Sequence, residues 1–363
     1  MESNKYEIPG IRELSTVCPL PPQALAPQGF ADPLPPDAAW GRVTAVHRER
    51  YVVAAEQGEC FARLKGSAYY NGDEEFPTVG DYVLLRARQA SGEGDALILR
   101  TLPRRTVFER PDPDVGKAIQ AVAANFDTVW ICMSCNQNFN PARLERYAAA
   151  SWQTGAMPVV LLTKCDLAEN PEDYAARARA AAPGIDVLLL SARTGQGMEA
   201  LEPYLGPGQA AVLLGSSGVG KSSLVNALLG EEHMRVNAIR EEDGRGRHTT
   251  THRQMICLPG GALLMDTPGM RSLGLLDAEE GVEAVFADVE ELTGRCRFSD
   301  CTHTAEPGCA VKAALADGTL DPKRWESYQK LDRTARFMAD KIDYLRARTK
   351  LRRTAAPHRR RQG

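Results

Sequence analysis

The sequence lacks the features that mark membrane and secreted proteins. Its apolar runs are short, as at Val159 to Leu162, and none approaches the length that crosses a bilayer, so we expect no membrane-spanning helix. The N-terminus is charged and then rich in proline, without the basic start and apolar stretch of a secretory signal. We therefore expect a cytoplasmic protein.

A strong net charge and a disulfide pattern are also missing. The formal net charge is only -3, which by itself does not indicate a nucleic-acid partner, although it hides how charge is distributed. The nine cysteines are an odd number for a disulfide framework, which favours a reducing compartment. Four of them stand far apart: Cys18, Cys60, Cys165 and Cys257. Cys132 and Cys135 fall within and just after an apolar strand, and we interpret them as core residues.

A chain of 363 residues is long enough for two or three domains. Residues 1–38 are proline-rich without a periodic apolar face, which predicts a poorly ordered arm. Residues 39–105 contain five short β-like runs, which predict a small barrel. An OB-type barrel is the natural candidate, although an SH3-like barrel would give the same pattern. The runs are Gly41 to Val46, Tyr51 to Ala55, Cys60 to Leu64, Tyr82 to Arg86 and Leu97 to Leu99.

Residues 106–277 alternate apolar strands with helical stretches, which predicts an α/β domain with a parallel sheet. After that the strands stop, and residues 278–345 are expected to be mostly helical around a Cys/His cluster. Residues 346–363 form a basic tail, and from Lys341 to the end there are nine Lys or Arg against one acid. The expected strands are Thr128 to Met133, Pro158 to Leu162, Val187 to Leu190, Ala210 to Leu214 and Ala262 to Met265.

A phosphate-binding loop lies between an apolar strand and a predicted helix. The segment matches GxxxxGK[ST], in which glycines let backbone N–H groups surround phosphates. Lys221 is expected to neutralise phosphate charge and Ser222 to bind Mg²⁺. The nucleotide-binding residues predicted here are Gly215, Ser216, Ser217, Gly218, Val219, Gly220, Lys221, Ser222 and Ser223.

Two further motifs indicate a guanine nucleotide. Asp266 and Gly269 form a DxxG after an apolar strand, where the carboxylate supports Mg²⁺ and the glycine amide senses the γ-phosphate. Upstream, Thr163, Lys164 and Asp166 match [NT]KxD, and Ser191 with Ala192 matches the loop that contacts the guanine oxygen. The Asp166 carboxylate can accept both N1–H and N2–H₂ of guanine, which adenine cannot offer. Thr163 replaces the commoner asparagine, so we expect a weaker brace to the phosphate loop.

The motif order is base loop, phosphate loop, DxxG, whereas ordinary GTPases begin with the phosphate loop, so the domain is predicted to be circularly permuted. The segment from 244 to 251 suits a switch in which Thr250 binds Mg²⁺, with Thr249 and Thr251 as open alternatives. Met270 stands where many GTPases keep a water-orienting Gln, so slow intrinsic hydrolysis is expected. His248 is a candidate to position the water instead, the alternatives being a solvent-exposed residue or an RNA contact.

The pattern C-x4-C-x-H-x5-C predicts a zinc site. Its four ligands are Cys296, Cys301, His303 and Cys309. Three thiolates and an imidazole leave no open position for a reacting water, so one structural Zn²⁺ is expected.

Together these motifs resemble the RsgA/YjeQ family of ribosome small-subunit-dependent GTPases over about residues 40–345. Further matching stretches are Ala124 to Asp127, Phe139 to Asn140, Arg143 to Tyr147 and Glu306 to Ala310. The resemblance implies an N-terminal OB barrel, a circularly permuted P-loop GTPase domain and a C-terminal zinc domain. It also implies binding to the 30S subunit and its 16S rRNA, action late in 30S maturation, hydrolysis stimulated by the subunit and catalysis by His248.

Two other functions are weighed against this one. The first is a nucleotide-gated module on a different RNA, since the barrel, zinc module and basic tail all suit RNA. The second is an ATP-dependent enzyme, which Asp166 disfavours. The sequence contains no clear dimer interface, so a monomer is the default expectation.

Overall fold

The computed structural model describes residues 38–47, 50–55, 58–64, 76–86, 94–111, 119–230, 253–266 and 279–336. Three of the predicted segments lie outside these ranges: the proline-rich arm up to residue 37, the switch from 244 to 251 and the basic tail.

The N-terminal part is a five-stranded barrel. Its strands are β1 (Ala38–His47), β2 (Arg50–Ala55), β3 (Gly58–Leu64), β4 (Tyr82–Arg86) and β5 (Ala96–Thr101). They pair in the order β1-β2-β3-β5-β4, and pairing of β4 with β1 closes the barrel around Val43, Val53, Val83 and Ile98. Because β3 runs parallel to β5, the barrel is a Greek key of the OB type and not an SH3-like barrel.

The central part is an α/β sheet covered on both faces. Its parallel strands are β8 (Thr128–Ser134), β9 (Met157–Thr163), β10 (Asp186–Leu189), β11 (Ala210–Leu214) and β13 (Leu263–Asp266), in the order β10-β9-β8-β11-β13. Helices α3 (Pro141–Trp152) and α4 (Pro171–Ala181) pack on one face. Helix α5 (Lys221–Leu229) and the 3-10 segment η2 (Met198–Tyr204) pack on the other. Alternate residues of β8, such as Ile131 and Trp130, enter the two cores.

Barrel and central sheet are joined by backbone pairing. Strand β12 (Arg253–Cys257) runs antiparallel to β13 and also to β1, with Ala45 opposite Gln254, so one sheet of eleven strands continues from the nucleotide-binding domain into the barrel. A hairpin of β6 (Val107–Pro111) and β7 (Ile119–Ala124) adds to the junction. The buried Arg42 side chain donates to the carbonyl oxygens of Gly80 at 3.4 Å and Asn125 at 2.6 Å.

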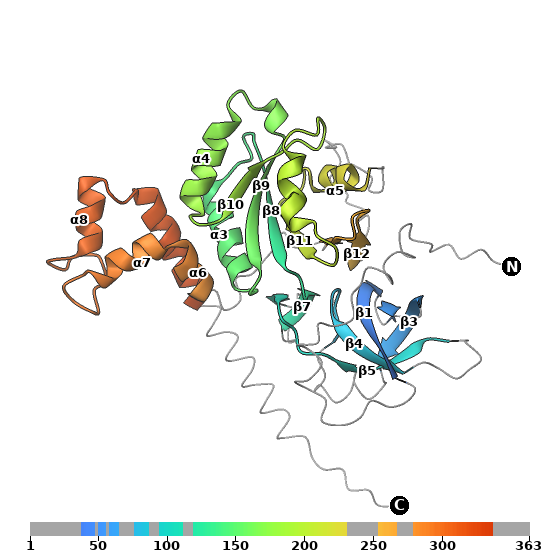
Figure 1. Cartoon of the computed structure of the whole chain (residues 1–363). Coiled ribbons are helices and arrows are strands. Elements are labelled where there is room, and N and C mark those ends of the chain that lie inside the picture. The colour runs from blue at the N-terminus through green and yellow to red at the C-terminus, as the bar shows by residue number, and fades with distance from the viewer. Residues whose placement is uncertain are drawn as a thin grey trace, which may run out of the picture.

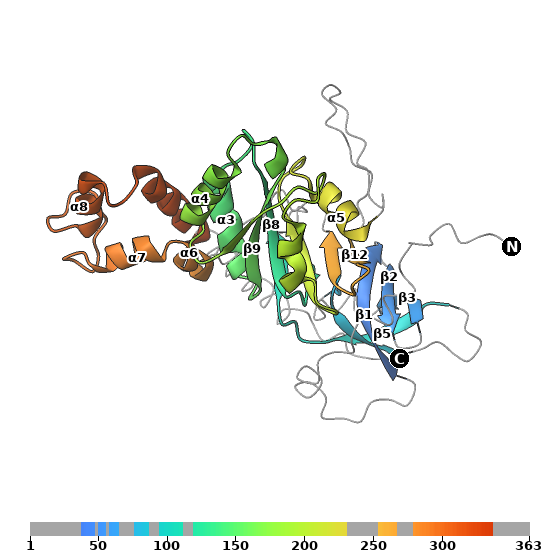
Figure 2. The same cartoon turned by 45° about the horizontal axis from the view of Figure 1, so that its top comes forward.

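The C-terminal part is helical, as expected. It contains α6 (Glu279–Val285), α7 (Ala287–Gly294), α8 (Ala310–Asp317) and a helical stretch over 322–336. These helices lie on the side of the central domain away from the barrel, next to α3 and α4, in both views (Figures 1 and 2). In the ranges that the structure covers, no helix combines the length and apolar character needed to cross a membrane.

Candidate active site and metal centre

The predicted nucleotide motifs meet at one edge of the sheet. Parallel strands end at the same edge, and the base loop follows β9, the phosphate loop follows β11, and Asp266 ends β13. Chain order proceeds from β8 to β9 and β10, and then crosses to β11 on the opposite side of β8. Ligands of open α/β sheets bind at such a reversal, so the topology places the phosphate loop where a nucleotide is expected.

The phosphate loop has the backbone that its glycines permit. Gly215 has a φ of 154°, and a Cβ atom there would lie 2.6 Å from the carbonyl oxygen of Cys132, so a side chain does not fit. Helix α5 begins at Lys221, directly after the loop, which gives the site the positive end of a helix. The Lys221 ammonium donates to the carbonyl oxygens of Gly215 at 2.6 Å and Ser216 at 2.8 Å. A cation is thus held at the loop, and Ser222 lies in the first turn of α5.

The base loop is tied to the phosphate loop by two side chains. The buried hydroxyl of Thr163 is within hydrogen-bonding distance of the carbonyl oxygens of Val219 and, at 3.2 Å, Met133. Lys164 donates from Nζ to the carbonyl oxygen of Gly218 at 2.6 Å. Threonine therefore reaches the phosphate loop although its side chain is shorter than the asparagine usual at this position.

Asp166 and Ser191 lie together, as the base-reading assignment requires. The hydrogen bond from the Ser191 hydroxyl lowers the pKa of Asp166, and Arg193 lowers it further, against the raising effect of desolvation. Ser191 itself is buried, and its oxygen accepts the amide N–H of Thr194 at 3.2 Å. Ala192 is packed against the core beside it. The site thus presents an ionised carboxylate on a fixed loop.

Three of the predicted site residues lie outside the described ranges: His248, Thr250 and Gly269. Asp266 is described as the final residue of β13, beside the strand that leads into the phosphate loop.

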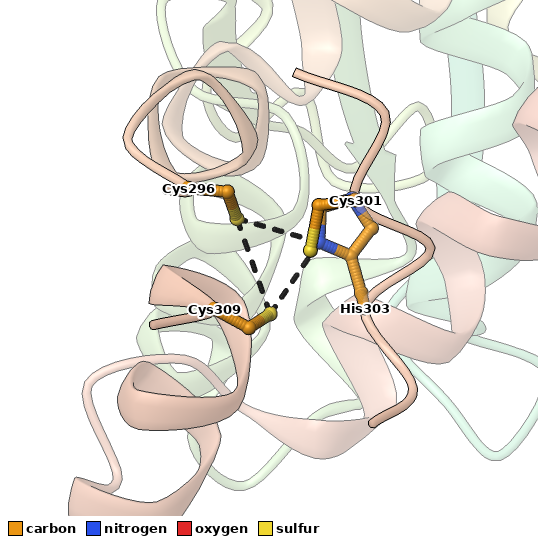
Figure 3. Close-up of side chains that lie close together, drawn as sticks. All are labelled: Cys296, Cys301, His303 and Cys309. Carbon is orange, nitrogen blue, oxygen red and sulfur yellow. Dashed lines mark hydrogen bonds between the residues drawn. The ribbon is translucent and has the colours of Figure 1, made fainter. Parts of the chain in front are cut away.

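The four predicted metal ligands converge on one point (Figure 3). Cys296 Sγ lies 3.9 Å from Cys309 Sγ and 3.5 Å from His303 Nδ1, and Cys309 Sγ lies 3.6 Å from the same nitrogen. A tetrahedral zinc ion with bonds of about 2.3 Å to sulfur and about 2.0 Å to nitrogen requires about 3.8 Å between sulfurs and about 3.5 Å between sulfur and nitrogen. The Cys296, Cys309 and His303 atoms therefore have the separations of a tetrahedral zinc site, and the Cys301 Sγ lies within 4.8 Å of each of them.

Glu306 supports the ligand loop, a role that the sequence pattern did not reveal. Its carboxylate accepts the amide N–H groups of Thr302 at 2.9 Å and of Thr304 and Ala305 at 3.0 Å, as well as the Thr302 hydroxyl. These bonds lower the pKa of Glu306 to about 2, and the bond to the Thr302 side chain has the largest effect. The His303 backbone has a φ of 61° within this loop. The carboxylate thus helps to hold a strained turn between the second and fourth ligands.

Arg324 joins the C-terminal helices to the central domain. It donates to both carboxylate oxygens of Asp288 at 2.7 Å and to the carbonyl oxygen of Val285 at 3.0 Å. It also lies 3.5 Å from Glu145 of α3, a buried carboxyl group whose pKa is raised by desolvation. Its guanidinium lies over the Phe286 ring at 4.7 Å. One side chain therefore ties the helical stretch over 322–336 to α3 and α7.

The chain is similar to known proteins of one family. The model of the RsgA GTPase family matches residues 101–276. The small ribosomal subunit biogenesis GTPase RsgA 1 of Listeria monocytogenes is 47% identical over 305 residues, which cover 84% of this chain and 86% of that protein. The small ribosomal subunit biogenesis GTPase RsgA of Xanthomonas euvesicatoria is 41% identical over 348 residues, which cover 94% of this chain and 93% of that protein.

Two solved structures share the architecture. The crystal structure of YjeQ from Thermotoga maritima superposes with a TM-score of 0.59 at 26% identity, covering 82% of this chain and 98% of that one. The crystal structure of YloQ, a circularly permuted GTPase, gives a TM-score of 0.55 at 26% identity, with coverage of 82% and 95%.

Proposed function

The chain belongs to the RsgA GTPase family and is a GTP hydrolase, and we propose that it binds the 30S ribosomal subunit, assists late maturation of that subunit and leaves it when GTP is hydrolysed. The observation that carries the proposal is the extent of the match. Relatives named as small ribosomal subunit biogenesis GTPases align over 84% to 94% of this chain, so the alignment extends well beyond the nucleotide-binding domain. The proposal places the protein in the cytoplasm, where ribosomal subunits mature.

For the nucleotide, we assign Asp166 to the guanine N1–H and N2–H₂ groups, with Lys164 along the base and Ser191 and Ala192 at the guanine oxygen. The support is the position of the ionised Asp166 beside Ser191, on a loop that Thr163 fixes to the phosphate loop. The backbone N–H groups from Gly215 to Ser223 surround the phosphates. Ser222, Thr250 and Asp266 hold Mg²⁺, which supplies positive charge to the phosphate oxygens, and Gly269 senses the γ-phosphate.

For hydrolysis, we assign His248 as the residue that positions the attacking water. Met270, at the position after DxxG, carries no hydrogen-bonding group able to orient water strongly. An imidazole nitrogen can accept a proton from water at neutral pH. Because His248 belongs to a switch segment, the 30S subunit can stimulate hydrolysis by fixing that segment over the γ-phosphate.

For the metal centre, we propose one structural Zn²⁺. The support is the agreement between the sulfur and nitrogen separations and tetrahedral zinc geometry. The four protein ligands complete the coordination, and the ion then stabilises the C-terminal helices without taking part in hydrolysis.

For the RNA contacts, we propose the barrel and the basic tail at 346–363. On the barrel, the Arg50 guanidinium lies 3.8 Å from the centre of the Phe61 ring. Arg50 and Arg63 both form ion pairs with the Asp95 carboxylate. Exposed arginine side chains beside a half-buried aromatic ring on a barrel surface suit the backbone and bases of RNA. Their contribution to binding should fall as salt rises.

Co-sedimentation tests the partner. The protein is mixed with purified 30S or 50S subunits in the presence of GDP or a non-hydrolysable GTP analogue, and the bound fraction is measured after pelleting. The proposal predicts binding to 30S subunits that is stronger with the GTP analogue, and little binding to 50S subunits. Equal binding to both subunits, or none to 30S, would contradict it and favour a nucleotide-gated module on a different RNA.

A further inference from the structure

The carboxylate assigned to guanine already has a partner within the chain. Arg193 donates to Asp166 Oδ2 from Nε at 3.1 Å and from Nη2 at 2.7 Å. The two residues differ strongly in exposure, since 73% of the Arg193 side chain but only 10% of the Asp166 side chain is accessible. The exposed arginine therefore covers the carboxylate from the solvent side.

The donor group of Arg193 has the same chemistry as the edge of guanine. In guanine, N1–H and N2–H₂ are attached to one carbon, C2. In arginine, Nε–H and Nη2–H₂ are likewise attached to one carbon, Cζ, in a planar fork. Both groups place an N–H and an NH₂ side by side against a carboxylate.

We propose that Arg193 occupies Asp166 in place of the base and is an intramolecular competitor of guanine nucleotides. This rests on the proposed role of Asp166 as the guanine reader. Because both donors of Arg193 hold Oδ2, the Asp166 carboxylate is not available to accept N1–H and N2–H₂ of the base together. Binding of the base requires the guanidinium to leave, and its exposure gives it a path into solvent.

The competition acts on the protein without nucleotide, so it should change the association rate of the nucleotide and not its dissociation rate. Only molecules in which Arg193 has left Asp166 accept the base. The observed association rate is therefore the rate for such molecules multiplied by their fraction of the population. Once guanine is bound, Arg193 has no access to the carboxylate, so the dissociation rate is not affected. Exposed ion pairs are worth roughly 0.2–1 kcal/mol, which corresponds to an effect of about 1.4- to 5-fold.

Stopped-flow binding of a fluorescent GDP analogue tests the inference. Arg193→Ala should raise the association rate by about 1.4- to 5-fold and leave the dissociation rate unchanged. Arg179→Ala is the matched control, because Arg179 is another exposed arginine, 3.8 Å from Glu172, and should behave as the unmodified protein. An unchanged association rate in Arg193→Ala, or faster dissociation of GDP, overturns the inference, since the second result would make Arg193 a nucleotide contact.

A double substitution separates this inference from the role of Asp166. In Asp166→Asn, the amide can donate to the extra C2 oxygen of xanthine and accept from N1–H, while Arg193 loses its anionic partner. Adding Arg193→Ala to Asp166→Asn should therefore leave the association of xanthosine diphosphate unchanged; an increase like that seen for GDP would show that Arg193 acts elsewhere. If Asp166→Ala retained its preference for GDP over ADP, the reader assignment itself would fail, whatever Arg193→Ala does.

Discussion

The hydroxyl of Thr163 contacts the carbonyl oxygen of Val219, which links the end of β9 directly to the phosphate loop. Both residues are buried. The loop assigned to the base and the loop assigned to the phosphates are thus kept at a fixed separation before a nucleotide arrives, which should reduce the ordering cost of binding.

Replacing Thr163 with valine should weaken nucleotide binding. Valine has nearly the same shape but no hydroxyl, so the Val219 oxygen loses this donor, at a cost of roughly 1–3 kcal/mol. We expect a lower melting temperature and at least about a five-fold weaker GDP affinity, measured by thermal unfolding and fluorescence titration. Thr163→Ser keeps the hydroxyl and should remain close to the unmodified protein. Wild-type affinity in Thr163→Val would show that the link has no role in binding.

Removing one metal ligand should release zinc and unfold the C-terminal helices. Metal analysis of the purified protein should find one zinc per chain, and Cys309→Ala should lose it, because the three remaining ligands bind far more weakly. Loss of helical signal and protease cleavage between 279 and 336 should accompany the loss of metal. Cys60→Ser, a half-buried cysteine of the barrel, is the control and should retain zinc. A metal-free Cys309→Ala protein with intact C-terminal helices would contradict a structural role.

Glu306 should slow the release of the metal, and its effect should persist at mildly acid pH. Its pKa is lowered from 4.5 to about 2, so its stabilising bonds are fully present above the unfolded value and are lost only as pH falls towards about 2. Glu306→Gln should release zinc to a chelator faster at both pH 7 and pH 5, by a similar factor. A difference that is present at pH 7 and disappears at pH 5 would contradict the lowered pKa, because it would mean that Glu306 takes up its proton above the ordinary value of 4.5.

Arg324 should be needed for the C-terminal helices to remain docked on the central domain. Arg324→Ala leaves Glu145 buried without its cationic partner, and breaking such a pair costs about 3–5 kcal/mol. We expect intrinsic GTP hydrolysis to be unchanged and stimulation by 30S subunits to be lost. Arg336→Ala is the control from the same helical stretch, because its pair with Asp332 is exposed and should contribute little. Equal stimulation of both variants would contradict the docking role.

Local sequence patterns predicted the modules and the metal ligands. The five barrel runs and the five parallel strands were found because apolar runs and turn residues alternate in short segments. The four predicted metal ligands lie within one stretch of the chain, so their spacing alone was informative. The phosphate loop was equally local, because its glycines and lysine are adjacent.

Long-range relationships were not predictable from those patterns. Strand β12 also pairs with β1, which is about two hundred residues earlier in the sequence, and no local pattern indicates that pairing. Likewise, Arg324 and Glu145 become partners only when the helices dock, and an ion pair between distant residues has no spacing signature. Arg193 followed the predicted guanine loop directly, yet its contact with Asp166 depends on how two separate loops meet. The role of Glu306 was also missed, although an acid between two predicted ligands in a Thr-rich turn is a local signal for a carboxylate that accepts backbone N–H groups.

The proposed function is tested by GTP turnover with and without purified 30S subunits, for the unmodified protein and for His248→Ala, with 50S subunits as the control. We expect slow turnover alone, strong stimulation by 30S but not 50S subunits, and loss of that stimulation in His248→Ala while GTP still binds. If 30S subunits gave no stimulation under conditions in which GTP binds, the proposed function would be contradicted. If His248→Ala were stimulated as fully as the unmodified protein, the catalytic assignment of His248 would be wrong.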